Sequence, residues 1–464
     1  MPFTQAELEK KLTELIEAHN IPGAQLTVLD GDTMTEVAAG VLSLRTGCPA
    51  TTDALFLPGS IGKLYTATLV LMLADDGLID IDKPVRTYLP DFEVRDHQAR
   101  DTVTVRDLLC HRSGFDGDVF LDTGRGDDAL VKYLAQLTDL PQICEPGKMW
   151  SYSNSGYAIL GRLIEVVGGT VYETALCERL FTPLGLEHTV SFPEDVIPHP
   201  HAVGHVANPD NRSEYIVSPQ WGLFRSVAAM GAAIVASASD VLRLVSLHLN
   251  GGVAPDGTRL LSSDTVAAMQ EQQIRLVDDT VVGNAWGLGW LLDTFGDVPV
   301  IGHDGNSVGQ NAFMRVAPEQ RFGMCLQTNV ESALSMYREL AVWLFGERLG
   351  VTPRSDPQPQ SSRSVADPGR YVGTYVREGV GWEIAVVADG SLTASVAATH
   401  AAAEVTAIPP MNDLPLVPAD RDDSFLLKLP ISDSELLAVF FNPDDEAGVP
   451  TYMHFGGRAH RRAS

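Results

Sequence analysis

The chain has 464 residues, of which 45% are apolar and 20% charged, and its formal net charge is −27. At about 100 to 200 residues per domain this length predicts two or three domains, and the apolar content excludes a disordered chain. The excess of 60 acidic over 33 basic residues argues against nucleic acid and anionic membranes as partners, because both require a basic face.

The N-terminus and the cysteines predict a soluble cytoplasmic protein. The first twenty residues lack a basic start followed by an apolar core, so no export signal is expected. The longest apolar stretches fall short of the roughly 18 to 20 residues that a membrane span needs. The five cysteines are widely spaced and form no C-x-x-C pair, which predicts free thiols in a reducing compartment and neither a disulfide framework nor a zinc site. They are Cys48, Cys110, Cys144, Cys177 and Cys325.

In chain order, the first 350 residues predict an α/β (α+β) domain: an antiparallel sheet flanked by helices, with a large helical lobe. Apolar residues at helical spacing predict an N-terminal helix, and a β-rich hairpin follows it. A mainly helical region comes next, and then late strands and a helix. The hairpin covers 24–29 and 35–41, the helical region 61–244, the strands 298–301, 312–316 and 322–328, and the last helix 332–349.

The remainder predicts a small all-β domain behind a linker. Residues 351–364 are rich in Pro, Ser and Gln and cannot bury much apolar surface. Short β runs then recur between turns, which is typical of a barrel or sandwich of seven or eight strands. The runs are 371–376, 382–387, 392–396, 403–408, 424–429, 435–441 and 451–455. We therefore predict domains at 1–350 and 367–464, joined by 351–366.

The first motif is Ser60-x-x-Lys63, which follows a Pro-Gly turn where a helix is predicted to start. Residues three apart lie on the same helix face. A serine alcohol becomes a good nucleophile when a neighbour removes its proton, and a lysine amine of lowered pKa does so. Serine is also a favoured helix cap, so this motif alone is weak.

Two further motifs supply polar groups from distant parts of the chain. Tyr152-Ser153-Asn154 stands between a Pro-Gly loop and a predicted helix. A tyrosine there could relay the serine proton, and the Asn154 amide could bind a substrate carbonyl or position Lys63. His303-Asp304-Gly305 follows a strand, where Gly305 would allow close approach of the substrate. A capped loop and an Asp-Gly turn are the corresponding structural interpretations.

Together the three motifs resemble those of the serine β-lactamase and penicillin-binding protein superfamily, in particular its class C β-lactamase, D-aminopeptidase and β-lactamase-like esterase branch. The resemblance covers roughly residues 5–350. It extends through the stretches LLCHRSGF, EPGKMWSYSNSGYAILGRLIE, LFTPLGLEHT, AAMGAAIVASASDVLRL, WGLGW and GHDGNSVGQNAFMRVAPEQ. Beyond the linker, strand density and the GTY at 373–375 resemble the lipocalin-like domain of many relatives.

The resemblance implies catalytic roles for Ser60, Lys63 and Tyr152 and substrate-binding roles for Asn154 and His303. It also implies an acyl-enzyme on Ser60 and one oxyanion-hole donor at the Ser60 backbone N–H. The second donor is expected after the third motif, near Gly305 and Asn306. No cofactor and no metal are implied.

The third motif departs from the Lys-Thr-Gly usual in penicillin-binding proteins and β-lactamases. A neutral His303 binds a carboxylate less well than a lysine, and Asp304 would repel an anion. We therefore expect β-lactam and DD-peptide cleavage to rank below cleavage of a small ester, an amide or a D-amino-acid peptide.

Several other patterns in the sequence have competing interpretations. Residues 305–309 fit the G-x-S-x-G nucleophile elbow, but strand-like sequence follows Ser307 where an elbow needs a helix. The histidines of IPHPHAVGH have a spacing that suits no regular metal site. Three further residues are candidates for the border of the cleft, but a core aromatic explains the tyrosine among them, and a solvated turn the two aspartates, equally well. The histidines are His199, His201 and His205, and the cleft candidates Tyr65, Asp116 and Asp118.

The sequence thus predicts a serine hydrolase acting on a small-molecule acyl substrate. An acyltransferase of secondary metabolism, using the same acyl-enzyme with an amine or alcohol acceptor, stays open. So does a non-catalytic ligand sensor on the same fold, although the intact motifs argue against it. The role of the β-domain and self-association into a homo-oligomer are left open.

Overall fold

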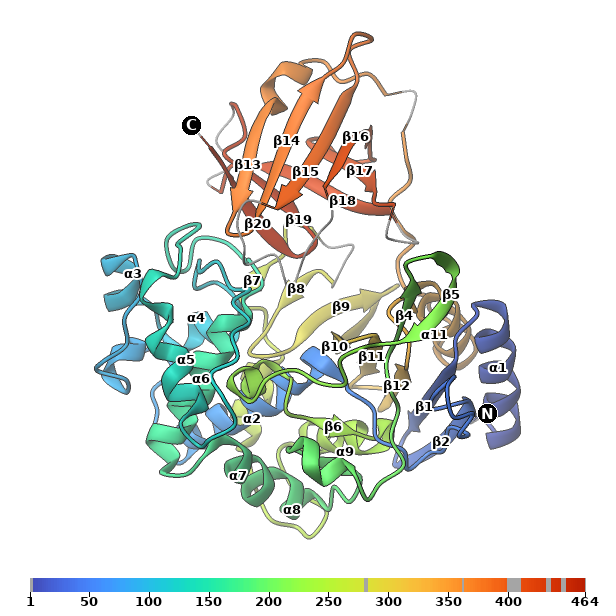
Figure 1. The fold of residues 1–464 in the computed structure, drawn as a ribbon. Helices are drawn as coiled ribbons and strands as arrows, with labels where there is room; N and C mark the ends of the chain where they lie inside the picture. The colour runs from blue at the N-terminus through green and yellow to red at the C-terminus, as the bar shows by residue number, and fades with distance from the viewer. Residues whose placement is uncertain are drawn as a thin grey trace.

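The computed structural model describes residues 3–278, 283–360, 363–398, 410–430, 435–443 and 448–463. It has a mixed α/β fold in which helices flank an antiparallel sheet, and a closed β-barrel follows (Figure 1). This is the fold class that the sequence predicts. Within the described ranges, every helix is too short or too polar to cross a membrane.

The central sheet joins the two ends of the first 350 residues. Strand β1 pairs with β2 on one side and with β12 on the other, so that Leu26 lies opposite both Val37 and Leu326. The eight described strands run in the order β2-β1-β12-β11-β10-β9-β8-β7. Their bounds are β1 Gly23–Asp30, β2 Thr33–Gly40, β7 Ile274–Arg275, β8 Ala285–Trp286, β9 Leu291–Phe295, β10 Val298–Ser307, β11 Gln310–Ala317 and β12 Phe322–Thr328.

One face of the sheet is covered by the first and last helices of this region, α1 (Gln5–Ala18) and α11 (Leu334–Leu349). Apolar side chains of both helices, among them Leu12 and Leu340, share one core cluster with sheet residues such as Leu26. A capping box between Thr4 and Glu7 fixes the start of α1. This layer is therefore complete only when α1 and α11, from the two ends of the first 350 residues, come together.

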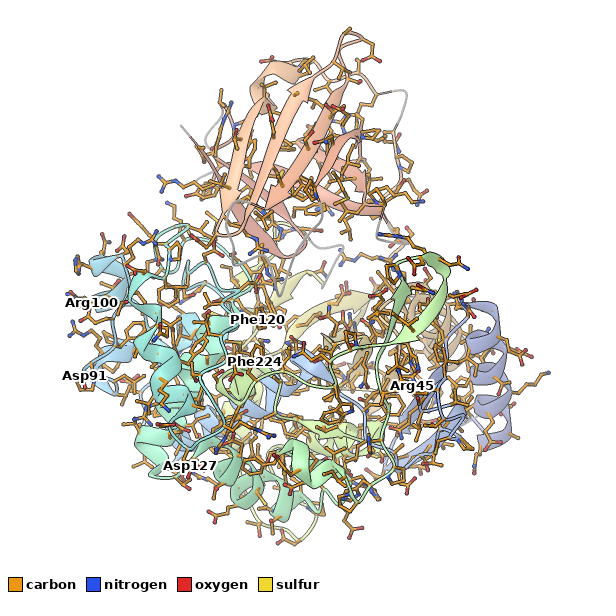
Figure 2. All side chains as sticks on the ribbon, in the orientation of Figure 1. Arg45, Asp91, Arg100, Phe120, Asp127 and Phe224 are labelled. Carbon is orange, nitrogen blue, oxygen red and sulfur yellow. The ribbon has the colours of Figure 1, made fainter. Side chains whose placement is uncertain are left out.

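The other face packs against the helical lobe, at whose centre lies α2 (Gly62–Asp75). Its residues from Gly62 to Leu73 are all buried, as expected for a helix that is apolar on every side. In Figure 2, Asp91 and Arg100 lie at the outer edge of this lobe and Phe120 lies toward the centre of the molecule. The other helices are α3 His97–Thr102, α4 Val105–Leu109, α5 Ala129–Ala135, α6 Asn154–Gly168, α7 Tyr172–Leu176, α8 Thr182–Leu184, α9 Ala238–Leu249 and α10 Ser263–Met269.

Two short antiparallel strand pairs complete this region. Strand β3 (Thr189–Val190) pairs with β6 (Val235–Ala236), and β4 (His205–Asn208) pairs with β5 (Asn211–Val217). The β4–β5 pair reaches toward the barrel, where the Arg212 guanidinium donates to the Pro430 carbonyl oxygen at 3.4 Å.

The C-terminal strands form a closed barrel in the order β13 to β20 (Figure 1). Its core includes Trp382, Phe425 and Phe440. The bounds are β13 Gly373–Arg377, β14 Val380–Val386, β15 Leu392–Ala398, β16 Met411–Pro418, β17 Ser424–Lys428, β18 Glu435–Phe441, β19 Tyr452–Phe455 and β20 Arg458–Arg462.

Two barrel strands were not predicted, and one predicted run, 403–408, lies outside the described residues. Strand β16 contains Pro415 and β20 reads RAHRR, so neither shows an apolar alternation. Both are strands because neighbours pair with them: Met453 of β19 lies opposite His460. Closure of the barrel, a tertiary effect, overrides their weak local preference.

The packing of α11 on the sheet predicts a clear contrast between two substitutions in this helix. Leu340→Ala removes a side chain with no exposed surface and leaves a cavity, so we expect the free energy of unfolding to fall by about 2 to 5 kcal/mol. Val342→Ala, where the side chain is 46% exposed, should change it by less than about 0.5 kcal/mol. Urea unfolding followed by circular dichroism measures both. Equal effects would contradict this packing.

Candidate active site

Ser60 lies where strand β10 presses against the start of α2. A 3-10 turn, Gly59–Ile61, precedes the helix, and Gly59 has a φ of +54°. A Cβ atom on Gly305 of β10 would lie 1.9 Å from the Pro58 carbonyl oxygen and 2.8 Å from the Ser60 nitrogen. Glycine at 305 is therefore what allows the third motif to touch the first.

Lys63 is fully buried one helical turn after Ser60. Its Nζ donates to Ser60 Oγ at 3.0 Å and to the Met230 carbonyl oxygen at 2.5 Å. Burial, aided by the charge of Arg458 and opposed by that of Asp118, holds the pKa of Lys63 well below its usual value. A neutral amine in this position can accept the Ser60 proton.

Tyr152 brings the second motif next to Ser60 and Lys63, although it lies 89 residues after Lys63 in the sequence. Lys63 Nζ lies 4.9 Å from the centre of its ring. Burial raises the pKa of the Tyr152 phenol, while the interaction with the Ser60 side chain and the charge of Arg458 lower it. The structure thus brings Ser60, Lys63 and Tyr152 together.

His111 fixes the position of the segment that carries Tyr152. Its Nδ1 accepts the Ser153 backbone N–H at 3.0 Å, and its ring stacks on that of Tyr152 with the centres 4.1 Å apart. Burial keeps the pKa of His111 well below its usual value, so the ring stays neutral and Nδ1 can accept.

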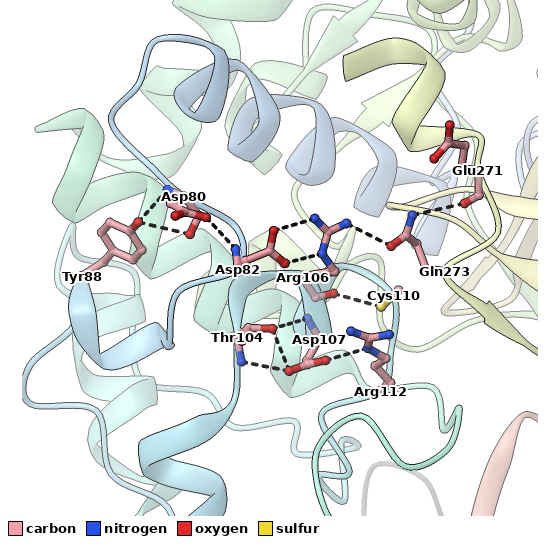
Figure 3. A network of polar contacts seen from close by, with 10 residues as sticks. All are labelled: Asp80, Asp82, Tyr88, Thr104, Arg106, Asp107, Cys110, Arg112, Glu271 and Gln273. Atoms are coloured by element: carbon pink, nitrogen blue, oxygen red, sulfur yellow. Dashed lines mark hydrogen bonds and ion pairs between the residues drawn. The ribbon is translucent and has the colours of Figure 1, made fainter. Parts of the chain in front are cut away.

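A polar network anchors the segment that carries His111 (Figure 3). Thr104 and Asp107 form a capping box at the start of α4, and Asp107 accepts from Arg112 Nε at 2.6 Å. Arg106 donates to both Asp82 oxygens, at 2.6 and 2.8 Å. The turn on which His111 sits is therefore fixed on both sides.

Asn154, the first residue of α6, makes a different contact from those considered in the sequence. Its Nδ2 donates to Asp118 Oδ1 at 2.7 Å, and no hydrogen bond to Lys63 occurs among the described side chains. Asp118 also accepts two hydrogen bonds from Arg458 of the barrel strand β20, at 3.0 and 3.1 Å. One N–H of the Asn154 amide and its oxygen remain available to the cleft.

His303 lies inside β10 and presents an acceptor. Its ring is 2% exposed, and burial lowers its pKa to about 3. Because Nδ1 lies 2.6 Å from the Asp304 carbonyl oxygen, which can only accept, Nδ1 carries the proton of the neutral ring. The lone pair is on Nε2, which has no partner within the described part of the chain.

Two expectations for β10 need correction. Asp304 does not act as an isolated negative charge, because Arg315 donates to both of its oxygens, at 2.6 and 2.9 Å. The motif is not a hairpin turn either, since β10 continues to Ser307. Ser307 is followed by the β10–β11 hairpin, so the strand-to-helix geometry of a nucleophile elbow is absent there.

The motifs line one cavity of about 1100 Å³. Ser60, Tyr152, Asn154, His303, Gly305, Asn306 and Ser307 border it, together with Arg458 and Leu436 from the barrel. The backbone nitrogen of Asn306 lies 2.7 Å from the position that a Cβ on Gly59 would take, directly beside the Ser60 turn. The Asn306 backbone is thus adjacent to the Ser60 turn, its carbonyl oxygen 2.5 Å from the same Cβ position, and its role as the second oxyanion-hole donor stays a prediction.

A family assignment follows from comparison with known proteins. Residues 8–347 match the family model described as Beta-lactamase. The chain belongs to the beta-lactamase family. It is 40% identical over 381 residues to penicillin-binding protein 4 of Amycolatopsis lactamdurans, a match that spans 82% of this chain and 99% of the relative.

Solved structures of the family resemble the chain. SurE has a TM-score of 0.80 at 28% identity, and its complex with D-Leu a TM-score of 0.77 at 27%; both matches cover 99% of each chain. The D-amino acid amidase of Ochrobactrum anthropi SV3, complexed with L-phenylalanine amide, has a TM-score of 0.59 at 25% identity over 69% of this chain and 90% of its own.

The remaining candidates lie outside the site or in its surroundings. Tyr65 is a core aromatic beside Phe181. His205 is buried and contacts Leu44 and Asn329 backbone atoms, and no group of three metal-ligating side chains is found among the described residues. The sequence did not identify His111 or Arg458. The only signal for His111 was the stretch HRSG. Arg458 lies in the basic tail RAHRR, whose sequence does not indicate a place in the site.

The contact between β10 and the Ser60 turn generates a prediction for this family member. Gly305→Ala should displace Ser60, so we expect activity to fall by about 100-fold or more, the effect of a shift near 1 Å. Gly346→Ala is the control: it lies in α11, where an added Cβ meets nothing within 4 Å, and should stabilise the protein by about 0.5 to 1 kcal/mol without loss of activity. Rates of p-nitrophenyl ester hydrolysis distinguish them. Full activity of the Gly305 variant would contradict the geometry.

Proposed function

We propose that this protein is a serine hydrolase that forms an acyl-enzyme on Ser60. The observation that carries the proposal is the fully buried Lys63 amine, 3.0 Å from Ser60 Oγ, with its pKa held low by burial. A charged lysine could not take a proton, whereas a desolvated neutral one can. Such an arrangement needs neither cofactor nor metal.

The reaction proceeds in two steps. Lys63, with Tyr152 beside it, takes the Ser60 proton as Oγ attacks the substrate carbonyl. The N–H groups of Ser60 and Asn306 stabilise the oxyanion, by on the order of 3 kcal/mol each. Collapse expels the alcohol or amine, which receives the proton. Water, deprotonated by the same groups, then attacks the ester and releases Ser60.

The acyl group of the substrate is proposed to end in a D-amino acid. Support comes from the similarity to SurE, which was crystallised with D-Leu, and to a D-amino acid amidase. The neutral His303, whose free nitrogen is an acceptor, supplies no cation for the carboxylate of a β-lactam. A small ester or amide therefore suits the site better than a penicillin.

An acyltransferase is the second candidate, favoured by the size of the cavity. About 1100 Å³ is at the upper end of small-molecule sites and leaves room for an acceptor beside an aminoacyl group. Deacylation would then pass the acyl group to an amine or alcohol in place of water.

We also propose the division into a catalytic domain at 1–350, a linker and a barrel domain at 367–464, in a cytoplasmic protein.

Labelling tests the nucleophile. A fluorophosphonate probe should modify the wild-type protein once, at Ser60, because this is the activated serine. Ser60→Ala should lose the label, whereas Ser307→Ala should keep it. Peptide mapping by mass spectrometry locates the adduct, and a label that persists in Ser60→Ala refutes the assignment.

A substrate comparison tests the acyl group and the acceptor. D-aminoacyl anilides should be cleaved at least about 10-fold faster than their L counterparts, and nitrocefin should be a poor substrate. Added hydroxylamine or a D-amino acid amide should yield an acylated amine if transfer operates. Liquid chromatography with mass spectrometry follows each product, and Ser60→Ala is the blank. A preference for L-anilides would contradict the proposed substrate class.

A further inference from the structure

The turn Gly456–Gly457 between β19 and β20, together with the start of β20, contacts the catalytic segment at two points. The Tyr152 N–H donates to the Gly457 carbonyl oxygen at 3.0 Å. Ser151 Oγ accepts the Ala459 N–H at 3.2 Å. The barrel thus holds Ser151 and Tyr152 at the point where the chain enters the cleft.

Arg458 adds side-chain contacts at the same place. Its guanidinium carbon lies 4.6 Å from the centre of the Tyr152 ring, and its two bonds to Asp118 fix the carboxylate that orients Asn154. The side chains are 23% exposed for Arg458 and 11% for Asp118. A partly buried ion pair therefore connects two residues of the second motif to the barrel, and Arg377 of β13 lies 3.3 Å from the same carboxylate.

Resting on the proposed function, we propose that Arg458 is a positioning residue of the active site, which the barrel supplies to hold Tyr152 and Asn154 for reaction at Ser60. It touches none of the reacting atoms. Asn154 can donate one N–H to Asp118 only while Asp118 is held in place. The Tyr152 ring, for its part, stacks on His111 and has the Arg458 guanidinium beside it. The catalytic site is then incomplete without the barrel.

The electrostatic consequence has a definite sign. Among the described residues, the titratable side chains around Lys63 and Arg458 are Tyr152, Tyr157, His111, His303, Asp116, Asp118, Arg377 and His454. Burial keeps the rings of this set neutral. Arg458 lowers the pKa of Lys63, and Asp118 raises it. Loss of Arg458 therefore keeps Lys63 protonated to higher pH, and loss of Asp118 does the opposite.

The test is the pH dependence of Ser60 labelling by a fluorophosphonate. Arg458→Gln should reduce the labelling rate constant at pH 7 by about 100-fold and move the acidic limb of the profile to higher pH. Asp118→Asn should move that limb to lower pH. A structural defect alone would move neither limb, and both substitutions break the same ion pair.

Two further variants complete the design. Arg458→Lys keeps the charge and loses the paired hydrogen bonds, so its limb should stay near that of the wild type while its rate falls by about 10-fold; with Asp118→Asn it carries the test should Arg458→Gln fail to fold. Arg461→Gln, at an exposed position of the same strand, should behave as the wild type. For anilide substrates, the Arg458 variants should lower kcat more than they raise KM.

The outcomes separate the two proposals. An unmoved limb in Arg458→Gln, or limbs that shift in the same direction in the Arg458 and Asp118 variants, overturns the role of Arg458 and leaves the Ser60 mechanism standing. Absence of any Ser60 label in the wild-type protein overturns both.

Discussion

The active site depends on one constraint: a lysine amine must stay uncharged next to a serine hydroxyl. Lys63 meets it by complete burial in α2, where desolvation lowers its pKa. An ammonium ion buried without a partner would be costly, so the neutral form is the one that the fold favours. In the neutral form an N–H donates to the Met230 carbonyl oxygen, and the lone pair can turn toward the Ser60 hydroxyl, 3.0 Å away, to accept its proton.

The rest of the architecture can be understood as the means of keeping that amine buried. Helix α2 is enclosed on all sides, between the sheet and the helical lobe. Strand β10 closes over the start of the helix because Gly305 lacks a side chain. The Tyr152 segment closes the remaining side, and it is held by His111 from the lobe and by Gly457 from the barrel. Three separate units thus exclude water from one nitrogen.

Much of this arrangement could be predicted from the sequence, because the relevant signals are local. The spacing of Ser60 and Lys63 already places both on one helix face, and the strand at 322–328 agrees with β12. The pairing of β1 with β12, about 300 residues apart, was not predicted; the strand runs indicated only early and late strands of one sheet. The chemical groups of the first two motifs could therefore be named before the structure was known.

What could not be predicted is set by contacts between distant segments. RAHRR shows no strand alternation, and only barrel closure makes β20 a strand and aims Arg458 at Asp118. Asp118 appeared as a solvated turn because its partners Asn154, Arg377 and Arg458 lie between 36 and 340 residues away. The neutral state of His303 depends in the same way on burial by the rest of the sheet.

These distant contacts also account for the unusual third motif. A Lys-Thr-Gly motif would place a cation on the strand, whereas β10 has the neutral His303 and an Asp304 already paired with Arg315. A cation beside Tyr152 comes instead from the barrel, as Arg458. Since Asp118 offsets its charge, the pair can lie close to Lys63 without adding net charge to the site. The barrel and the altered motif are thus two parts of one electrostatic arrangement.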